Sequence, residues 1–195
     1  MRVWGRFVCG LPVHLDNPFQ LFEDLGIGVI GTLMDEVKLT GYIPGAIGRI
    51  TELHGAYYSE HWNLGLFFES KIATELSEFL NRFDRTHDGF WAARLDQRIV
   101  GSVAIDGKEA LTNGARLRWL IVDPRFQGRG IGNRLLGRAV DFCRNANFKR
   151  VYLFTFVGLD PARHLYEKFG FVLCEELEDN QWGRTLTEQV FELFL

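Results

Sequence analysis

A strand, a glycine-rich turn and a helix follow one another between Leu117 and Arg144, and this junction constrains the fold more than any other stretch of the chain. Residues Leu117 to Val122 have the apolar and β-branched content of a buried strand, and Asp123-Pro124 ends it, because proline removes a backbone donor. Apolar residues then recur at helical spacing from Ile131 onward. The pattern predicts a helix from about Gly130 to Arg144, so a strand leads through a tight turn into a helix N-terminus.

The turn carries glycines at alternate positions, Gly128, Gly130 and Gly132. Without side chains, their N–H groups can approach an anion at the positive end of the helix dipole. An ordinary tight turn that needs glycine for positive φ is the alternative. Four guanidinium groups around the turn favour an anion site. They belong to Arg125, Arg129, Arg134 and Arg138.

The spacing argues against two common phosphate-binding loops. A nucleoside-triphosphatase loop ends in Gly-Lys-Ser/Thr, whereas Gly132 is followed by Asn133-Arg134. A dinucleotide-binding turn needs a third glycine where Asn133 stands, and an acidic residue about 20 positions later. Neither pattern fits this turn.

Two motifs carry a resemblance to a known family. The run Gln127 to Gly132 resembles the Q/R-x-x-G-x-G/A motif of the GCN5-related N-acetyltransferases (GNAT), and Ala162 to Phe171 is similar to the family's A-x-x-L-Y-x-x-x-G-F run. The resemblance covers roughly Pro44 to Leu195 and is closest to the acetyltransferase half of MarR-acetyltransferase fusions. It implies acetyl-CoA as the acyl donor, with its pyrophosphate at the glycine turn.

The resemblance also implies site residues. Tyr166 would be the acid that protonates the leaving thiolate, and Leu159 departs from the asparagine that relatives often carry seven residues earlier. The base is open, with Glu69 as the first candidate and Glu52 as the second, either directly or through water. The cofactor-binding candidates are Leu120, Ile121, Val122, Gln127, Gly128, Arg129, Gly130, Ile131, Gly132, Asn133 and Tyr166.

Two amphipathic helices are predicted before the first sheet strands, one from Ile43 and one containing Phe68 to Phe83. In the family such a pair covers the acceptor site. The first helix supplies the candidate acceptor-binding residues His54, Tyr57 and Tyr58, although aromatic residues at this spacing also suit a core.

The remaining strands follow from their apolar content. Phe90 to Leu95 and Arg98 to Ile105 read as a hairpin, Val151 to Phe156 as a buried strand, and Glu188 to Leu195 as a last strand. Asp160-Pro161 predicts a helix start with Asp160 as the N-cap. We expect an α/β (α+β) fold with a mixed, twisted, mostly antiparallel sheet and helices on both faces. The resemblance adds two central parallel strands that splay at the cofactor site.

Residues Met1 to Leu33 show no sustained period, so we treat 1–33 as an N-terminal extension of uncertain status and 34–195 as the acetyltransferase domain. One hypothesis is that Met34 is the natural start of the protein. The alternative is that the segment before it is an arm that packs on a neighbouring subunit, as in a homodimer. Three widely spaced cysteines, Cys9, Cys143 and Cys174, predict neither a disulfide framework nor a metal site.

Charge and hydropathy limit the partners. The net charge of −3 argues against general nucleic-acid binding, while nine basic residues stand against two acidic ones between Arg116 and Arg150. No signal peptide and no apolar run of the ~18 residues that a span needs is recognised. We therefore expect a cytoplasmic protein that contacts neither membrane nor nucleic acid.

The expected function is transfer of an acetyl group from acetyl-CoA to a primary amine by direct attack, the acceptor being a small molecule or a protein amine. A catalytically silent acyl-CoA sensor is the alternative, and nucleotide binding unrelated to CoA is disfavoured by the motifs.

Overall fold

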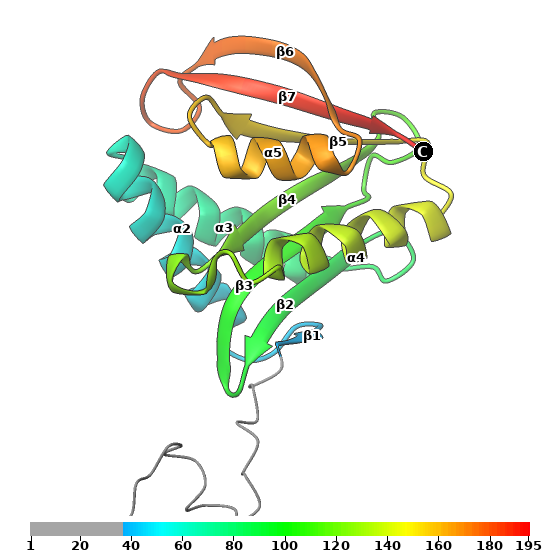
Figure 1. Ribbon diagram of the computed structural model, residues 1–195, viewed down its shortest axis with the longest axis horizontal. Coiled ribbons are helices and arrows are strands. Elements are labelled where there is room, and N and C mark those ends of the chain that lie inside the picture. The colour runs from blue at the N-terminus through cyan, green and yellow to red at the C-terminus, as the bar shows by residue number, and fades with distance from the viewer. Residues whose placement is uncertain (1–36) are drawn as a thin grey trace, which may run out of the picture. The chain divides into compact units, whose positions relative to one another are not determined.

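The computed structural model describes residues 37–195, which form one mixed seven-stranded sheet with helices packed on it (Figure 1). The expectations for residues 1–33 lie outside the described part. In chain order the elements are β1 (Lys38–Thr40), α2 (Ala46–Trp62), α3 (Leu66–Asn81), β2 (Gly89–Leu95), β3 (Arg98–Asp106), β4 (Ala115–Val122), η1 (Pro124–Phe126), α4 (Ile131–Asn145), β5 (Arg150–Phe156), α5 (Asp160–Lys168), β6 (Val172–Asp179) and β7 (Leu186–Phe194).

The strand order is β1-β2-β3-β4-β5-β7-β6, and β4 and β5 form the parallel pair in an otherwise antiparallel sheet. This confirms the predicted fold class. One prediction is wrong at the level of a single element: Leu159 rather than Asp160 precedes the first turn of α5, with no side-chain cap. The strands β1 and β6 are additions that the sequence analysis does not predict.

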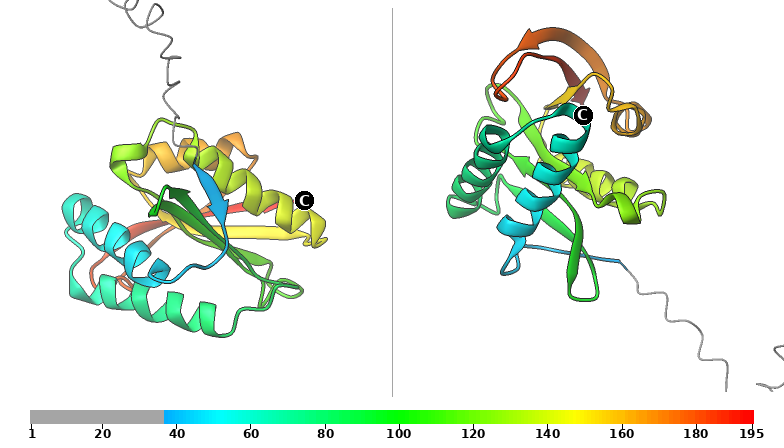
Figure 2. Two further views of the ribbon diagram at one scale, coloured as in Figure 1. Left: turned by 90° about the horizontal axis from the view of Figure 1, so that it is seen from below. Right: turned by 90° about the vertical axis from the view of Figure 1, so that its left-hand side faces the viewer.

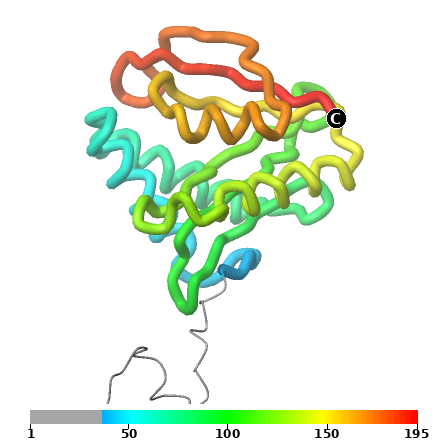
Figure 3. The backbone as a smooth tube through the Cα atoms, in the orientation of Figure 1, coloured from blue at the N-terminus to red at the C-terminus, as the bar shows by residue number. Residues whose placement is uncertain are grey.

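Helices cover both faces of the sheet, as expected. The right-hand view of Figure 2 shows α2 and α3 on one side and α4 and α5 on the other. The backbone trace in Figure 3 likewise places α4 and α5 on the same side. Among residues 37–195, none of the helices combines the length and the apolar character that crossing a bilayer would require.

Two apolar cores lie on the two faces. Helix α4 buries its stripe of Ile131, Leu135, Ala139 and Cys143 against β2, β3 and β4, and α5 adds Tyr166 to the same core. On the opposite face, α3 buries Phe68, Ile72, Leu76 and Phe79, which join α2 and the strand residues Phe90 and Trp119. The two cores fix the central strands from both sides.

Candidate active site

A bulge in β4 shapes the centre of the sheet. Ala104 faces Arg118 across the ladder but Ser102 faces Ile121, so β4 has one more residue than β3 between these pairs. Trp119 takes a positive φ of 49°, and its carbonyl accepts a hydrogen bond of 2.8 Å from Ser102 Oγ. A bulge of this kind bends its strand and increases the local twist. Beyond the bulge β4 still pairs with β3, at Ile121 and Val122, but not with β5.

The parallel pair is joined over two positions only. Ala115 and Arg116 of β4 pair with Val151 and Tyr152 of β5, and the ladder then ends. Strand β5 continues to pair with β7 along its other edge. A cleft of about 380 Å³ lies where the two strands separate. Its walls include Leu120, Ile121 and Val122 from β4, and Thr155, Leu159, Ala162, Leu165 and Tyr166 from the β5–α5 segment.

The glycine turn closes one end of this cleft. Gly128 and Gly130 have φ of 74° and 76°, and a Cβ built on either would meet no atom within 4 Å. Gly130 is the N-cap of α4 and offers no side-chain cap, so the first N–H groups of the helix have no partner within the helix. The glycines therefore fit both the tight turn and the anion site that the sequence suggests. They adopt positive φ, and they leave an open cradle of N–H groups that suits a phosphate.

The basic residues that face the cleft are not the arginines around the turn. Arg125 binds the carboxylate of Asp123 at 2.6 Å and holds the pKa of that buried group below its ordinary value. Arg129 lies over the Phe126 ring at 5.3 Å. None of the four arginines lines the cleft, so the expected role of Arg129 gains no support from its position. Arg125 has a carboxylate as its partner, so its place beside the turn does not by itself indicate a phosphate.

Lys168 and His164 of α5 supply the basic side chains at the cleft instead. Lys168 Nζ donates a hydrogen bond of 2.8 Å to Oδ1 of Asn133, at the start of α4. The sequence contained the signal, because Pro161, Leu165 and Lys168 follow one another at the spacing of a single helix face. Of the predicted cofactor-binding residues, all except Arg129 line the cleft.

A second, smaller cavity adjoins the cleft on the side of α2 and α3. It has a volume of about 90 Å³, and four residues line both spaces, which makes them neighbours. The shared residues are Tyr58, Leu120, Thr155 and Tyr166. The predicted acceptor residues divide between the spaces: His54 lines the small cavity, Tyr57 the cleft, and Tyr58 both.

Of the two shared tyrosines, Tyr166 is buried and Tyr58 is partly buried. Tyr166 is 5% exposed, and burial raises its pKa above the ordinary value. Burial also raises the pKa of Tyr58, and the nearby Tyr166 adds to the shift. Within residues 37–195 neither hydroxyl forms a hydrogen bond to another side chain or to the backbone. Both phenols are therefore protonated at neutral pH, and their hydroxyls are available to a ligand.

His54 is a neutral imidazole in the wall of the small cavity. Burial lowers its pKa to about 4. Its Nδ1 lies 2.8 Å from the carbonyl oxygen of Ile50, which can only accept, so Nδ1 carries the proton. The lone pair therefore lies on Nε2, and His54 can accept a hydrogen bond there.

The expected base Glu69 lies outside both spaces. The face of α3 that lines the small cavity consists of Phe68, Ile72 and Glu75, at helical spacing. Glu69 is rotated by one residue from this face, is exposed, and packs toward Gly55 of α2. Glu52 also lines neither space; its side chain is 64% exposed and pairs with Arg49. Glu75 is thus the carboxylate in the cavity wall.

Glu75 is held by two cations. Its Oε1 pairs with Lys71 at 2.6 Å, and its Oε2 forms a close ion pair with Arg118 of β4. Arg118 also contacts Asp106 at 3.5 Å. These contacts fix Glu75 and Arg118 in the cavity wall and balance their charges.

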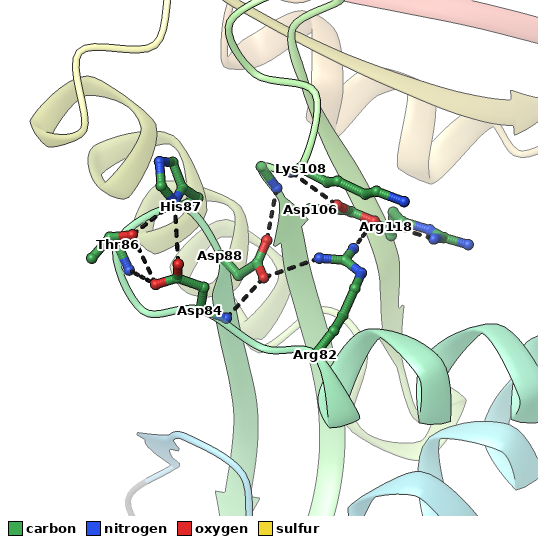
Figure 4. Close-up of polar contacts among 9 residues, drawn as sticks. Arg82, Asp84, Thr86, His87, Asp88, Asp106, Lys108 and Arg118 are labelled. Atoms are coloured by element: carbon green, nitrogen blue, oxygen red, sulfur yellow. Dashed lines mark hydrogen bonds and ion pairs between the residues drawn. The ribbon is translucent and has the colours of Figure 1, made fainter.

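The same chain of charges continues away from the cavity, into the loop after α3 (Figure 4). Asp106 pairs with Arg82 at 2.6 Å, and Arg82 pairs with Asp88 at 3.2 Å. Asp88 is 3% exposed and accepts hydrogen bonds from the backbone N–H groups of Asp84 and Gly107. Buried carboxylates satisfied in this way anchor a loop. The network thereby links the cavity wall to the loop between α3 and β2.

Comparison with known proteins agrees with this geometry. The sequence model of the Acetyltransferase (GNAT) family matches residues 47–171. The chain is 32% identical over 124 residues to N-acetylaspartate synthetase of Danio rerio, covering 63% of this chain and 43% of that protein. It is 30% identical over 101 residues to spermidine N(1)-acetyltransferase of Vibrio cholerae, covering 50% and 58%.

A solved structure shows the same fold. It is a putative acetyltransferase from Salmonella typhimurium with its cofactor acetyl-CoA, with a TM-score of 0.64 at 16% identity, covering 82% of this chain and 94% of that one. The chain spans less than half the length of the N-acetylaspartate synthetases that it matches.

Proposed function

Because the chain belongs to the acetyltransferase (GNAT) family, we propose that it is an N-acetyltransferase, which moves an acetyl group from acetyl-CoA to a primary amine by direct attack. The observation that carries this proposal is the meeting of two spaces at Tyr166: a long cleft that begins at the glycine turn, and a small cavity on the other side of the same tyrosine. A donor and an acceptor can thus reach one point from opposite sides.

The residues of the cleft fit acetyl-CoA. The open N–H cradle of Gly128 to Gly132 suits the pyrophosphate, and Lys168 adds a positive charge beside it. The edge of β4 at Leu120 to Val122 has no partner on β5, so its backbone can pair with the amides of the pantetheine arm. When bound, acetyl-CoA supplies an acyl group activated as a thioester. We propose residues 34–195 as the domain that performs the reaction.

Proton transfer follows from the protonation states in the cavity. The acceptor arrives as an ammonium ion and must lose one proton to become a neutral nucleophile, and it can donate that proton to Nε2 of His54 before it attacks. With a pKa of about 4, His54 does not retain the proton, which passes to water. Both oxygens of Glu75 are engaged by Lys71 and Arg118, so Glu75 orients the wall and is the weaker candidate. The Tyr166 hydroxyl gives its proton to the leaving sulfur and regains one from the amine nitrogen, so that an amide, the free thiol and one released proton result.

Replacing Tyr166 by phenylalanine tests the enzyme directly. Tyr166→Phe keeps the ring and removes only the hydroxyl, so acetyl-CoA affinity should stay within about twofold while turnover falls. A positioned acid contributes roughly 10²–10⁴-fold to the rate. Tyr152→Phe is the matched control, since Tyr152 lies on β5 outside both spaces.

Release of free CoA thiol from a panel of primary amines is the measurement, with calorimetry for acetyl-CoA binding. Turnover of Tyr166→Phe within twofold of the parent would show that the hydroxyl is not the acid. Tight acetyl-CoA binding without turnover of any amine would favour the acyl-CoA sensor.

The acceptor and the setting remain proposals from sequence. The names of the relatives point to an anionic amine, aspartate, and to a cationic one, spermidine, so the names alone do not choose. We also predict a homodimer and a cytoplasmic location. A protein amine is the alternative acceptor, and the likeness to MarR-fusion acetyltransferases is a prediction from the two sequence motifs. Size-exclusion chromatography with light scattering tests the dimer.

A further inference from the structure

The residues that line the small cavity include one more arginine than carboxylates. Arg116 and Arg118 both line it, and Glu75 is the carboxylate among its lining residues. Glu75 and Asp106 already pair with Arg118. Arg116 forms no ion pair and no hydrogen bond through its side chain within residues 37–195; its guanidinium lies 4.7 Å over the ring of Phe154. The cavity therefore presents one guanidinium whose donors are not used.

A nearby buried acid, Glu188, forms no ion pair with Arg116 among residues 37–195. Glu188 is close enough for Arg116 to favour its ionised form, yet burial raises the pKa of Glu188 overall. Its two oxygens accept hydrogen bonds from Trp182 Nε1 and, at 2.9 Å, from Gln181 Nε2. The positive charge of Arg116 is also felt by Arg118, whose pKa is lowered by burial and by this repulsion. An anion in the cavity would relieve it.

The aromatic support orients this arginine. A guanidinium that rests on a ring keeps its plane fixed while its N–H groups remain free for a planar acceptor. A carboxylate matches that fork with two parallel hydrogen bonds. Because the residue lies on β4 beside the short β4–β5 ladder, its backbone is also held.

We infer that the acceptor is an amine which carries a carboxylate close to the amino group, and that Arg116 is the specificity-determining residue that receives this carboxylate. The inference rests on the proposed function and names its substrate class. Arg116 and Tyr166 line the same small cavity of about 90 Å³, so an acceptor with its amine at Tyr166 reaches Arg116 across a short separation between amine and carboxylate. An α-amino acid meets this condition, and a polyamine adds positive charge to a cavity that already has an excess.

Matched pairs of acceptors test the inference. Glycine and glycinamide, and alanine and alaninamide, differ only in carboxylate against amide. Rates are compared at equal concentrations of neutral amine, because the amides are weaker bases, and spermidine serves as the cationic arm. The parent should prefer the carboxylate by about tenfold or more in kcat/KM. Arg116→Gln should lose about 10- to 100-fold on the amino acids, mainly through KM, and change less than threefold on the amides.

Arg144→Gln is the control, since Arg144 lies at the end of α4, pairs with Asp141 and lines neither space. It removes the same charge and should leave both acceptor classes unchanged. Arg116→Lys keeps the charge without the fork and should retain part of the preference.

A binding measurement separates the two proposals. Calorimetric titration of CoA-saturated protein with each amino acid and amide reports the carboxylate preference without turnover. Arg116-dependent binding of the amino acid without acetyl transfer would support the inference and overturn the enzyme. Best turnover of spermidine, or an equal loss on acids and amides in Arg116→Gln, would overturn the inference and leave the enzyme standing. Folding is checked by acetyl-CoA affinity, which Arg116→Gln should not change.

Discussion

Two glycines of the same geometry, one inside the cleft and one outside, allow the phosphate cradle to be tested quantitatively. Gly130 caps α4 with φ 76° and ψ 3°, and Gly45 caps α2 with φ 87° and ψ −7°. A Cβ on either glycine meets no atom within 4 Å, and only Gly130 lines the cleft. Valine at either position therefore carries the same backbone strain, but only one of the two obstructs the cradle.

The strain costs about 1–2 kcal/mol in each variant, because an L-residue is forced into the left-handed region. For a domain of this size that lowers Tm by roughly 2–8 °C. Hydrogen bonds to a charged group contribute about 1.5–3 kcal/mol, so losing one phosphate contact should raise the Kd for acetyl-CoA by about 10- to 150-fold in Gly130→Val. Gly45→Val should leave this Kd within twofold.

Thermal unfolding and isothermal calorimetry give both quantities on the same samples. Equal Kd values for the parent and a folded Gly130→Val would refute the cradle, and so would an equal rise in the two variants. A larger fall in Tm for Gly130→Val than for Gly45→Val would show that the strain is not matched.

Two further predictions concern single charged groups. The unfolding free energy should fall as pH drops from about 6.5 toward 4, since unfolded His54 takes up a proton that the folded protein, with a pKa of about 4, does not bind; the contribution is roughly 3 kcal/mol. Urea titrations at several pH values should show a flatter profile for His54→Gln than for His61→Gln, which removes an exposed histidine with the same backbone bond. Lys168→Gln should raise the Kd for acetyl-CoA about tenfold and reduce its salt dependence, and Arg129→Gln should raise it less than twofold. A greater loss in Arg129→Gln would return the phosphate to that arginine.

The apolar elements could be predicted from sequence because each has one periodic, buried face. Helix α4 is the clearest case: Ile131, Leu135 and Ala139 recur at the spacing that the structure buries. Strand β6 could not be located, because VLCEELED is an edge strand in which acidic residues alternate with few apolar ones and most side chains are exposed. Strand β6 is held by its antiparallel pairing with β7, which its own sequence does not indicate.

The parts of the candidate site that are formed by the backbone could be predicted from the sequence. The parts that depend on the direction of a side chain were harder to predict. The glycine turn and Tyr166 follow from position in a motif. The choice between Glu69 and Glu75 depends on which face of α3 meets the cavity, and both lie on an amphipathic helix. Likewise Arg125 and Lys168 are both basic residues near the turn, and only the fold decides that the first meets Asp123 and the second meets Asn133.

The bulge at Trp119 was not predictable for a related reason. LRWLIV reads as a regular buried strand, and nothing in its apolar pattern marks an extra residue. The register against β3 creates the bulge, since Ser102 and Ala104 are matched by Ile121 and Arg118.

The two-position ladder between β4 and β5 gives this protein an edge in the middle of its own sheet. Sheet edges elsewhere attract foreign strands, and proteins protect them with charge or cover. This one borders the cleft, in a sheet that carries helices on both faces. A donor that binds as proposed would complete the sheet as a short extra strand does, by β-augmentation. It then acts as a structural part of the fold, adding about 2.7 kcal/mol of stability at a hundredfold excess over its Kd, so the level of free donor in solution would set how firmly the two halves of the sheet hold together.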